Sequence, residues 1–336
     1  MDFMKIVVRA PNWVGDSVLA LPAMNTIKRN YPESEVWVAA QDWVKDLFSM
    51  GDMFAGTISL PKQKGLKNLQ VSARRLRTSC FDLGILFTNS FASAFVFYLA
   101  RIPQRWGYKK DGRGLLLTKG IPVQSKENRV HQAHYYLNLL SGLGMKEFPE
   151  EHPLQVDQKE KTLTEEWLES QNIQIQRPLI IINPGAYYGS AKRWSAEKYA
   201  ELASLLQRKM RAQILIVGSA EETPLAEAIS SLMNERPHVL TGKTNLPRLA
   251  ALLSLADLFV TNDSGPMHLA NFLKIPLVAL FGPTEPARTG PYQQPAMVIH
   301  KEVPCWPCSY RQCPFDHRCM VDISPKEVLQ ACQKLL

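Results

Sequence analysis

The sequence predicts an α/β protein with two doubly wound parallel sheets. Short apolar runs that fit buried strands alternate with helix-like segments along most of the 336 residues. A chain of this length is natural for two domains, and its 46% hydrophobic residues are enough for large cores. Alternation of this kind builds parallel sheets with helices on both faces.

The first block of alternation defines a domain over residues 1–150. It contains an early helix over about 17–30 and closes with a helix near 131–140. The stretch 142–158 mixes prolines with charges and is the predicted linker. A second domain is therefore expected over residues 151–336.

The second block carries four clear strands at 179–182, 214–217, 258–260 and 276–281. Parallel sheets bind ligands beyond the carboxyl ends of their strands. We therefore expect two domains that face each other across a cleft, with the functional residues in the loops that follow the strands.

The most informative of these loops is residues 261–268, Thr-Asn-Asp-Ser-Gly-Pro-Met-His. A strand that passes into a helix through small polar residues leaves backbone N–H groups pointing at one spot, which favours a phosphate. His268 lies about one turn into the helix and can reach the same anion, although a structural histidine is the alternative. Asp263 and Ser264 have an alternative role as simple helix caps.

Two further loops of the second block fit a nucleotide. Lys192 and Arg193 follow the small-residue stretch that begins at Asn183, and both cations can pair with phosphate. Glu222 follows the next strand, where a carboxylate can accept hydrogen bonds from ribose hydroxyls. Stabilisation of a helix start is an equally good interpretation of Glu222.

The first block has one comparable loop, residues 9–16, which ends at Asp16. Asp16 either caps the following helix or acts as a general base. The residues alone favour the cap, because the helix dipole lowers a carboxylate pKa and makes it a poorer base.

The charge is concentrated in the first block. Residues 1–150 hold 20 Lys and Arg against 12 Asp and Glu, a net charge of +8, whereas residues 151–336 are balanced. Two clusters, at 62–77 and 101–119, carry much of the excess. They indicate either a solvated surface or an anionic partner, such as nucleic acid, an anionic membrane face or a phosphorylated acceptor.

Four cysteines crowd together near the carboxyl terminus, namely Cys305, Cys308, Cys313 and Cys319. The CxxC pair and the nearby His317 are typical of a structural zinc site, but the second half lacks that spacing. Reduced thiols that pack a tail are the alternative, and an iron–sulfur cluster is disfavoured. The isolated Cys80 and Cys332 are expected to be core residues.

Together these loops resemble glycosyltransferase family 9, the ADP-heptose:lipopolysaccharide heptosyltransferases. The resemblance covers nearly the whole chain and rests on the following stretches: 11–16, 183–186 with 191–194, 261–268, 281–284 and the cysteine-rich tail. Tyr187 and Tyr188 stand where the type I enzymes carry small hydroxyl residues, so the type II enzymes are the nearer match. Pro266 departs from the commoner aliphatic residue.

The resemblance implies a GT-B fold with two Rossmann-like domains and inverting heptosyl transfer without a catalytic metal. The first domain would bind the lipopolysaccharide inner core (Kdo–lipid A that already bears a heptose), and the second would bind ADP-heptose. A type II enzyme adds the second heptose. The C-terminal helix could pack back on the first domain.

The resemblance also assigns roles to single residues. Asp16 becomes the catalytic base, and Lys192 the cation on the diphosphate. The other donor-binding residues are Glu222, Asp263, Ser264, Gly265 and His268. The acceptor-binding residues are Arg9, Asn12 and Trp13.

Two alternative functions stay open. One is a GT-B enzyme with another nucleotide sugar or core acceptor. The other is a nucleic-acid-binding protein, which is disfavoured because the basic residues are not interleaved with a stacking platform. The apolar stretch 81–100 contains polar residues and fits a strand, a turn and a buried helix, not a membrane span. With no signal peptide evident, we expect a cytoplasmic protein, and a peripheral position on the anionic inner face of the inner membrane is a further expectation.

Overall fold

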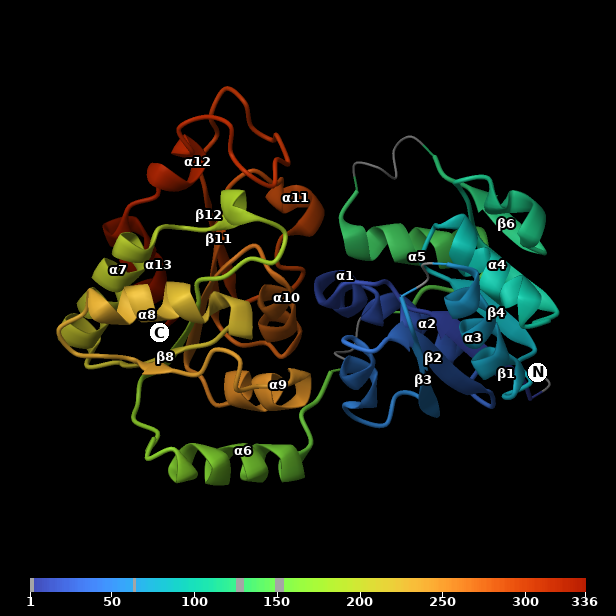
Figure 1. The fold of residues 1–336 in the computed structure, drawn as a ribbon, viewed down its shortest axis with the longest axis horizontal. Coiled ribbons are helices and arrows are strands. Elements are labelled where there is room, and N and C mark those ends of the chain that lie inside the picture. Colours follow the sequence, from blue (N-terminus) through green and yellow to red (C-terminus); the bar gives the residue numbers. More distant parts are fainter. Residues whose placement is uncertain (1–2, 63–64, 125–129, 149–153) are drawn as a thin grey trace. The chain divides into compact units, whose positions relative to one another are not determined.

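A computed structural model of the chain describes residues 3–62, 65–124, 130–148 and 154–336. Its contacts divide the chain into two compact units, Met1–Gln155 and Val156–Leu336. The α/β class with two doubly wound sheets is confirmed (Figure 1). The predicted domain boundary at residue 150 lies outside the described residues.

The first unit contains a six-stranded parallel sheet (Figure 1). Its strand order is β3 (Gly56–Leu60), β2 (Glu35–Gln41), β1 (Lys5–Arg9), β4 (Leu83–Leu86), β5 (Gln104–Lys109) and β6 (Lys119–Pro122). The chain starts at β1 and winds outward in both directions, so the strand order reverses between β1 and β4. Arg9 pairs with Leu86 at this point. The loops after β1 and β4 therefore meet at the carboxyl edge, where such sheets bind ligands.

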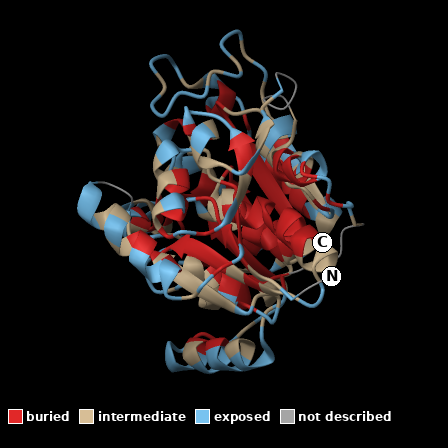
Figure 2. Ribbon diagram, turned by 90° about the vertical axis from the view of Figure 1, so that its right-hand side faces the viewer, coloured by how far each residue is buried: buried red, intermediate tan, exposed pale blue. Residues whose placement is uncertain are grey.

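The helices of the first unit form two packed groups. One group is α1 (Val14–Leu19), α2 (Leu21–Asn30) and α5 (Gln132–Gly142), which contact one another. The other is α3 (Leu66–Arg77) and α4 (Phe91–Leu99). Two short 3₁₀ helices, η1 (Lys45–Ser49) and η2 (Arg113–Leu116), follow β2 and β5. The strands β2, β1 and β4 at the middle of the sheet are largely buried, whereas the helices alternate between buried and exposed faces (Figure 2).

The second unit repeats this plan. Its strand order is β12 (Ala296–His300), β11 (Leu277–Phe281), β10 (Leu258–Asn262), β7 (Leu179–Asn183), β8 (Gln213–Ile216) and β9 (His238–Val239), all parallel. The order reverses between β7 and β10, and Asn183 pairs with Thr261 there. The loops that the sequence marks for phosphate binding thus start from adjacent strands.

Eight α-helices and two short 3₁₀ helices flank this sheet in the described part of the chain. They are α6 (Gln158–Ser170), η4 (Ser190–Lys192), α7 (Ala196–Met210), η5 (Ala220–Glu222), α8 (Thr223–Ser231), α9 (Leu246–Ser254), α10 (Gly265–Phe272), α11 (Pro286–Thr289), α12 (Arg318–Val321) and α13 (Pro325–Leu335).

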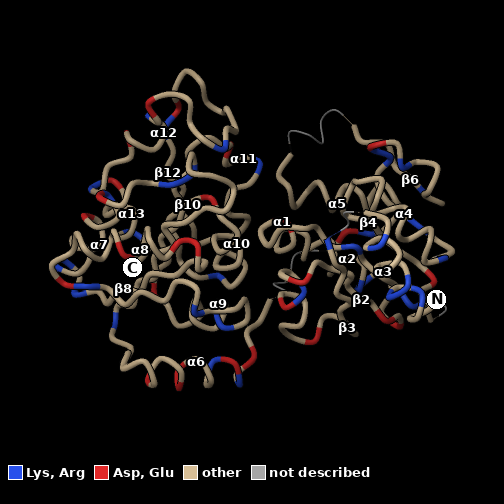
Figure 3. The backbone as a smooth tube through the Cα atoms, viewed as in Figure 1, with Lys and Arg blue, Asp and Glu red and all other residues tan. Residues whose placement is uncertain are grey.

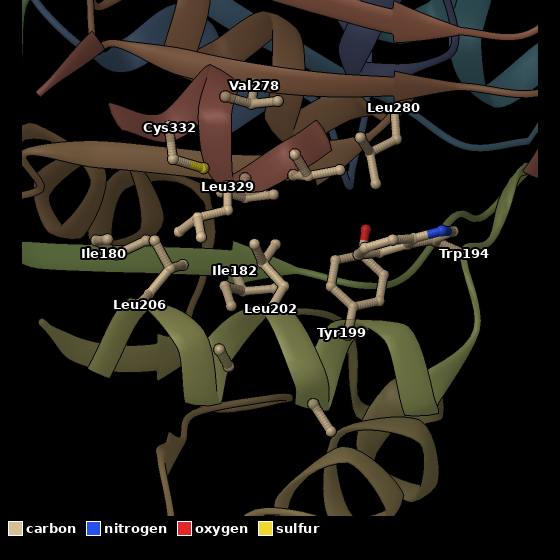
Figure 4. Packing of buried hydrophobic residues seen from close by; sticks show 14 of the residues in the cluster. Ile180, Ile182, Trp194, Tyr199, Leu202, Leu206, Val278, Leu280, Leu329 and Cys332 are labelled. Carbon is tan, nitrogen blue, oxygen red and sulfur yellow. The ribbon is translucent and has the colours of Figure 1, made fainter. Parts of the chain in front are cut away.

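The C-terminal helix belongs to the core of the second unit. Figure 4 shows Leu329 and Cys332 of α13 beside Ile180 of β7 and Leu206 of α7, and α13 also contacts β11 and β12. Its buried face therefore packs on its own unit. A contact between this helix and the first domain stays a prediction. Cys332 is a core residue as expected, and burial raises the pKa of its thiol to about 12. Cys80 is exposed, so its assignment to the core was wrong.

The stretch 81–100 forms strand β4 and helix α4, as predicted. Helix α4 is only partly buried, however, because Phe91 and Tyr98 are 49% and 51% exposed. Among the described residues, no helix has the length and apolar character needed to cross a membrane.

Candidate active site

The start of α10 carries the predicted anion site. Ser264 is the N-cap residue, and its Oγ accepts a hydrogen bond from the Met267 amide at 3.3 Å and lies 3.0 Å from Thr261 Oγ1. The cap interpretation of Ser264 is therefore confirmed. Pro266 has no N–H, and the Met267 amide is used by the cap. The helix-start amides of Ser264 and Gly265 are thus the donors best placed for an anion.

Lys192 and Asp263 form a buried ion pair beside this helix start. Lys192 Nζ donates to Asp263 Oδ2, and Thr284 Oγ1 donates to the same oxygen at 2.6 Å. The two side chains are 11% and 5% exposed. The Lys192 ammonium also lies 4.8 Å from the centre of the Tyr188 ring. Asp263 is therefore not a cap. It holds the Lys192 ammonium, and it directly precedes the N-cap residue Ser264 in the chain. A phosphate bound by Lys192 together with the Ser264 and Gly265 amides stays a prediction.

Asn262 is a residue of this site that the sequence analysis did not identify. It is completely buried, and its side-chain oxygen accepts hydrogen bonds from the Tyr199 hydroxyl at 2.9 Å and the Trp194 amide at 3.3 Å. Its Nδ2 donates to the carbonyls of Pro184 at 2.7 Å and Gly185 at 3.2 Å. Asn262 thus joins the end of β10 to the loop after β7. In the sequence, Asn262 could have been recognised as a polar residue at the last position of a largely apolar strand.

Glu222 lies under the loop after β7. Its Oε2 accepts a hydrogen bond from the Ser219 amide at 2.8 Å in a capping box, so the helix-start interpretation is confirmed. Gly185 approaches so closely that a Cβ atom there would stand 1.8 Å from Glu222 Oε1. This contact places the carboxylate at the carboxyl ends of β7 and β8. A ribose contact stays a prediction.

His268 is 5% exposed on the first turns of α10. It follows Ser264 by one helical turn, so the structure brings it to the same end of the sheet as the Lys192–Asp263 pair. Its role as a donor contact stays a prediction.

The structure changes the interpretation of Asp16. The N-cap residue of α1 is Trp13, with an extended backbone, and Asp16 is the third residue of the helix. The cap interpretation was therefore wrong. Asp16 is half-buried, and its negative charge, after burial itself, helps to raise the pKa of Tyr136 on α5. A carboxylate in a first turn is stabilised by the helix dipole.

The predicted acceptor residues differ in accessibility. Arg9 is completely buried, and burial lowers the pKa of its guanidinium to about 10. It donates to the carbonyls of Ala10 and Ala39 and, at 2.7 Å, to Asn12 Oδ1. Arg9 thus shapes the loop from inside, whereas Asn12 and Trp13 are exposed.

A second buried arginine lies at the same edge of the first sheet. Arg113 donates from Nε to the Tyr108 carbonyl at 2.8 Å and from Nη2 to Asn89 Oδ1 at 3.3 Å, and Asn89 donates to the Tyr135 hydroxyl at 2.8 Å. Burial lowers the pKa of Arg113 to about 10. In the sequence, Arg113 stands out only as a member of a basic cluster. Its hydrogen bonds and those of Asn89 tie the loop after β4 to the loop after β5 and to α5.

The cysteine-rich segment, defined as residues 303–319, holds the Lys192 loop. Tyr188 donates its hydroxyl to the Ser309 carbonyl at 2.8 Å, and the Ala191 amide donates to the Arg311 carbonyl at 3.0 Å. His317 Nε2 donates to the Ala191 carbonyl at 2.7 Å. These contacts fix the backbone on both sides of Ser190, immediately before Lys192.

The four clustered cysteines line one cavity of about 380 Å³ together with His317. All are free thiols, and burial followed by the neighbouring thiols raises the pKa of Cys319 to about 11. In the parts of the chain that the structure describes, no group of three or more His, Cys, Asp or Glu side chains is arranged to hold a metal. The structure therefore gives no support to the zinc hypothesis.

Comparisons with known proteins give the family of the chain. The family model described as glycosyltransferase family 9 (heptosyltransferase) matches residues 71–318. Lipopolysaccharide heptosyltransferase 2 of Escherichia coli is 32% identical, and the match covers 99% of both chains. Lipooligosaccharide heptosyltransferase 2 of Campylobacter jejuni is 30% identical with the same coverage.

Two solved structures have the same architecture throughout. ADP-heptose lipopolysaccharide heptosyltransferase II of Escherichia coli superposes with a TM-score of 0.84 at 30% identity, covering 99% of this chain and 98% of the other. A family 9 glycosyltransferase of Veillonella parvula gives a TM-score of 0.87 at 25% identity, covering 99% and 97%.

The fold and the site therefore define a glycosyltransferase of the GT-B type. More particularly, the chain belongs to glycosyltransferase family 9, and the full-length relatives described above are heptosyltransferases of type 2.

Proposed function

We propose that this enzyme transfers L-glycero-D-manno-heptose from ADP-heptose to the heptose already present on the lipopolysaccharide inner core. The relatives at 30–32% identity over whole chains carry the type 2 name, and this supports the acceptor assignment. The observation that carries the proposal is the buried Lys192–Asp263 pair, because Asp263 directly precedes the first residues of α10 and so supports a phosphate site made of the Lys192 ammonium and the helix-start amides.

The donor half of the reaction belongs to the second unit. As the bond between the heptose and the phosphate breaks, negative charge develops on the departing ADP. The Lys192 ammonium and the amides of Ser264 and Gly265 stabilise that charge. Electrostatic stabilisation of the transition state is the largest single contribution to the rate enhancement of many enzymes. His268 adds a contact to the diphosphate, and Glu222 binds the ribose. The hydrogen bonds of Asn262 and of the cysteine-rich segment hold the loop after β7, which carries Lys192, in a fixed position relative to the start of α10.

The acceptor half belongs to the first unit. The acceptor hydroxyl must lose its proton as it attacks, and Asp16 takes that proton as the general base. A positioned base of this kind contributes about 10²–10⁴-fold to the rate. One displacement inverts the configuration at the anomeric carbon. Asn12 and Trp13 are the exposed contacts for the acceptor, and Arg9 positions Asn12.

We further propose that transfer needs no metal cofactor, because Lys192 and the helix amides supply the positive charge that a metal ion would otherwise provide. The cysteine-rich segment then acts through its hydrogen bonds to the Lys192 loop. A zinc ion bound by the four thiols is a hypothesis that rests only on the spacing of the cysteines in the sequence. Metal analysis of the purified protein tests it. A stoichiometric metal removed without loss of transfer assigns the metal a structural role only.

The donor can be tested by thermal unfolding in the presence of ADP, UDP, GDP and their sugars. A ligand that binds only the folded state raises its stability by about 2.7 kcal/mol at a hundred times its Kd. We expect ADP and ADP-heptose to raise the Tm and the other nucleotides to leave it unchanged. A shift with UDP compounds alone would support another GT-B enzyme with a different nucleotide sugar.

A lipid-linked acceptor would place the enzyme in the cytoplasm, at the inner face of the inner membrane. We propose peripheral association there, supported by the net charge of +8 on residues 1–150.

A further inference from the structure

Helix α4 carries a row of aromatic side chains that the core of the first unit does not absorb. Phe91, Phe95 and Tyr98 follow one another at helical spacing, and the two outer residues are 49% and 51% exposed. Their rings stack in sequence, with centroids 5.9 Å and 6.5 Å apart. The opposite face of the helix, with Ser93 and Val96, is buried. A continuous exposed apolar row is typical of an interaction surface.

Two neighbouring elements extend this row. The short helix η2 packs against α4, and its Leu115 is 98% exposed. The Arg105 guanidinium lies 5.6 Å from the centre of the Tyr98 ring, and the exposed Arg101 follows the end of α4. An exposed cation therefore follows the aromatic row at the end of α4.

Helix α3 packs against α4 and adds further charge. Its Lys67, Arg74 and Arg77 are exposed. From residue 65 to residue 119 the sequence contains 10 Lys and Arg but only 2 Asp and Glu. Figure 3 colours the cations of α3 and of the segment after α4 blue. Arg105 donates to the carbonyls of Leu116 and Pro103 and is therefore not counted among the free cations. We define the α3–α4–η2 surface as Phe91, Phe95, Tyr98, Leu115, Arg101, Lys67, Arg74 and Arg77.

We propose that the α3–α4–η2 surface docks the protein on an anionic lipid bilayer. The aromatic rings and Leu115 enter the interfacial region, and the surrounding cations pair with lipid phosphates. Exposed aromatics with Lys and Arg on the adjoining polar face are the pattern that binds such membranes. The proposal deepens the membrane association under the proposed function, but it concerns a surface that can be measured without either substrate.

Other occupants fit the surface less well. A single-stranded nucleic acid needs aromatic faces that are open to bases, whereas the Phe91, Phe95 and Tyr98 rings stack on one another. The core of a protein interface is depleted in Lys and in charge generally, whereas cations flank this row closely. Anionic lipid satisfies both the apolar and the cationic part of the surface.

Vesicle co-sedimentation tests the proposal with the full-length protein and no substrate. We compare vesicles of phosphatidylcholine with vesicles that also contain phosphatidylglycerol, at low and high salt. The wild-type protein is expected to bind the anionic vesicles, and more weakly as salt rises. Lack of binding to anionic vesicles at low salt would overturn the proposal.

Two sets of substitutions separate the apolar and the charged contributions. The apolar variant is Phe91→Ser with Tyr98→Ser and Leu115→Ser, and we expect at least about a tenfold loss of vesicle partitioning. Its control is Leu232→Ser, a 55% exposed leucine of the second unit, which should bind like the wild type. Equal binding by the apolar variant and this control would contradict the proposal.

The charge variant is Lys67→Ser with Arg74→Ser and Arg77→Ser. Because each cation near an anionic surface contributes about 1 kcal/mol, we expect about a hundredfold loss of partitioning. The control removes the exposed Arg208 and Lys209 of α7 in the second unit. Circular dichroism of each variant shows that its fold is retained.

Two further readouts identify other occupants. If the apolar variant changes the sedimentation coefficient from that of a dimer to that of a monomer, the surface is an interface between copies, and the proposal is wrong. Heptosyl transfer to a deacylated, water-soluble acceptor should be unchanged in both variants. If the wild-type protein itself showed no heptosyl transfer, the proposed function would be overturned, but the measured binding to anionic vesicles would still test the docking surface.

Discussion

The ion pair between Lys192 and Asp263 allows a quantitative test of the donor site. In the Lys192→Met variant the 5% exposed Asp263 carboxylate loses its cation and keeps only the 2.6 Å hydrogen bond from Thr284. Breaking a buried pair from one side costs about 3–5 kcal/mol of folding stability. The single variant therefore loses both stability and the proposed catalytic cation, and its low activity alone would prove little.

The double variant Lys192→Met with Asp263→Asn separates the two effects. The asparagine oxygen can still accept the Thr284 hydrogen bond, and no charge remains buried. Replacement of a whole buried pair is often nearly neutral, so we expect a free energy of unfolding within about 1 kcal/mol of the wild type. The transition state still lacks its cation, and we expect kcat to fall by about 10²–10³-fold.

The assay combines chemical denaturation with steady-state transfer from ADP-heptose. Lys209→Met, on an exposed lysine of α7, is the matched control and should leave both quantities unchanged. Recovery of wild-type kcat in the stable double variant would show that Lys192 matters only as a partner for Asp263. That result would refute the role of Lys192 on the leaving diphosphate.

Three further predictions concern the supports of the site. Asn262→Leu removes four hydrogen bonds and should lower the free energy of unfolding by about 3 kcal/mol in urea denaturation. A loss of stability no larger than the roughly 0.5 kcal/mol of a typical surface substitution would contradict the idea that Asn262 joins β10 to the loop after β7. His317→Leu should weaken ADP binding by calorimetry because the Ala191 carbonyl loses its donor, while His317→Gln should recover part of the affinity. Cys332 is neutral in the folded protein, with a thiol pKa of about 12 against an ordinary 9.0, so its contribution to stability is full below pH 9 and is lost as the pH rises toward 12. Cys332→Ala should flatten this alkaline loss, and Cys80→Ala, at an exposed thiol, should not.

Local sequence patterns were enough to find the strands at 179–182, 214–217, 258–260 and 276–281 and the loops that follow them, but they did not reveal β3, β5, β6 or β12. The loop after β10 contains small polar residues between an apolar strand and a helix, so its ability to bind an anion follows from backbone geometry. Ser264 was recognised as a possible cap and Glu222 as a residue that stabilises a helix start, because both effects depend on residues only a few positions apart.

Features that depend on distant parts of the chain could not be predicted. The burial of Arg9 and Arg113 results from the loops and helices that cover them, and the sequence shows only two cations. Asn262 is important because it faces a loop some 80 residues earlier, after β7. The N-cap position of α1 fell on Trp13 because the backbone stays extended to that residue, which places Asp16 one turn further in than a cap.

The hydrogen bonds of the cysteine-rich segment illustrate the same limit. CxxC spacing suggested a metal because ligand spacing is a local signal. The contacts from Ser309, Arg311 and His317 to the Lys192 loop join segments more than 100 residues apart. Only the folded chain shows that this segment supports the donor loop.

The most direct test of the account measures single-turnover transfer from ADP-heptose to the heptose-bearing inner core by the Asp16→Asn variant, together with its ADP-heptose Kd. The account predicts a rate lower by about 10²–10⁴-fold with an unchanged Kd, because the base belongs to the first unit and the donor site to the second. Undiminished transfer by Asp16→Asn would contradict the mechanism.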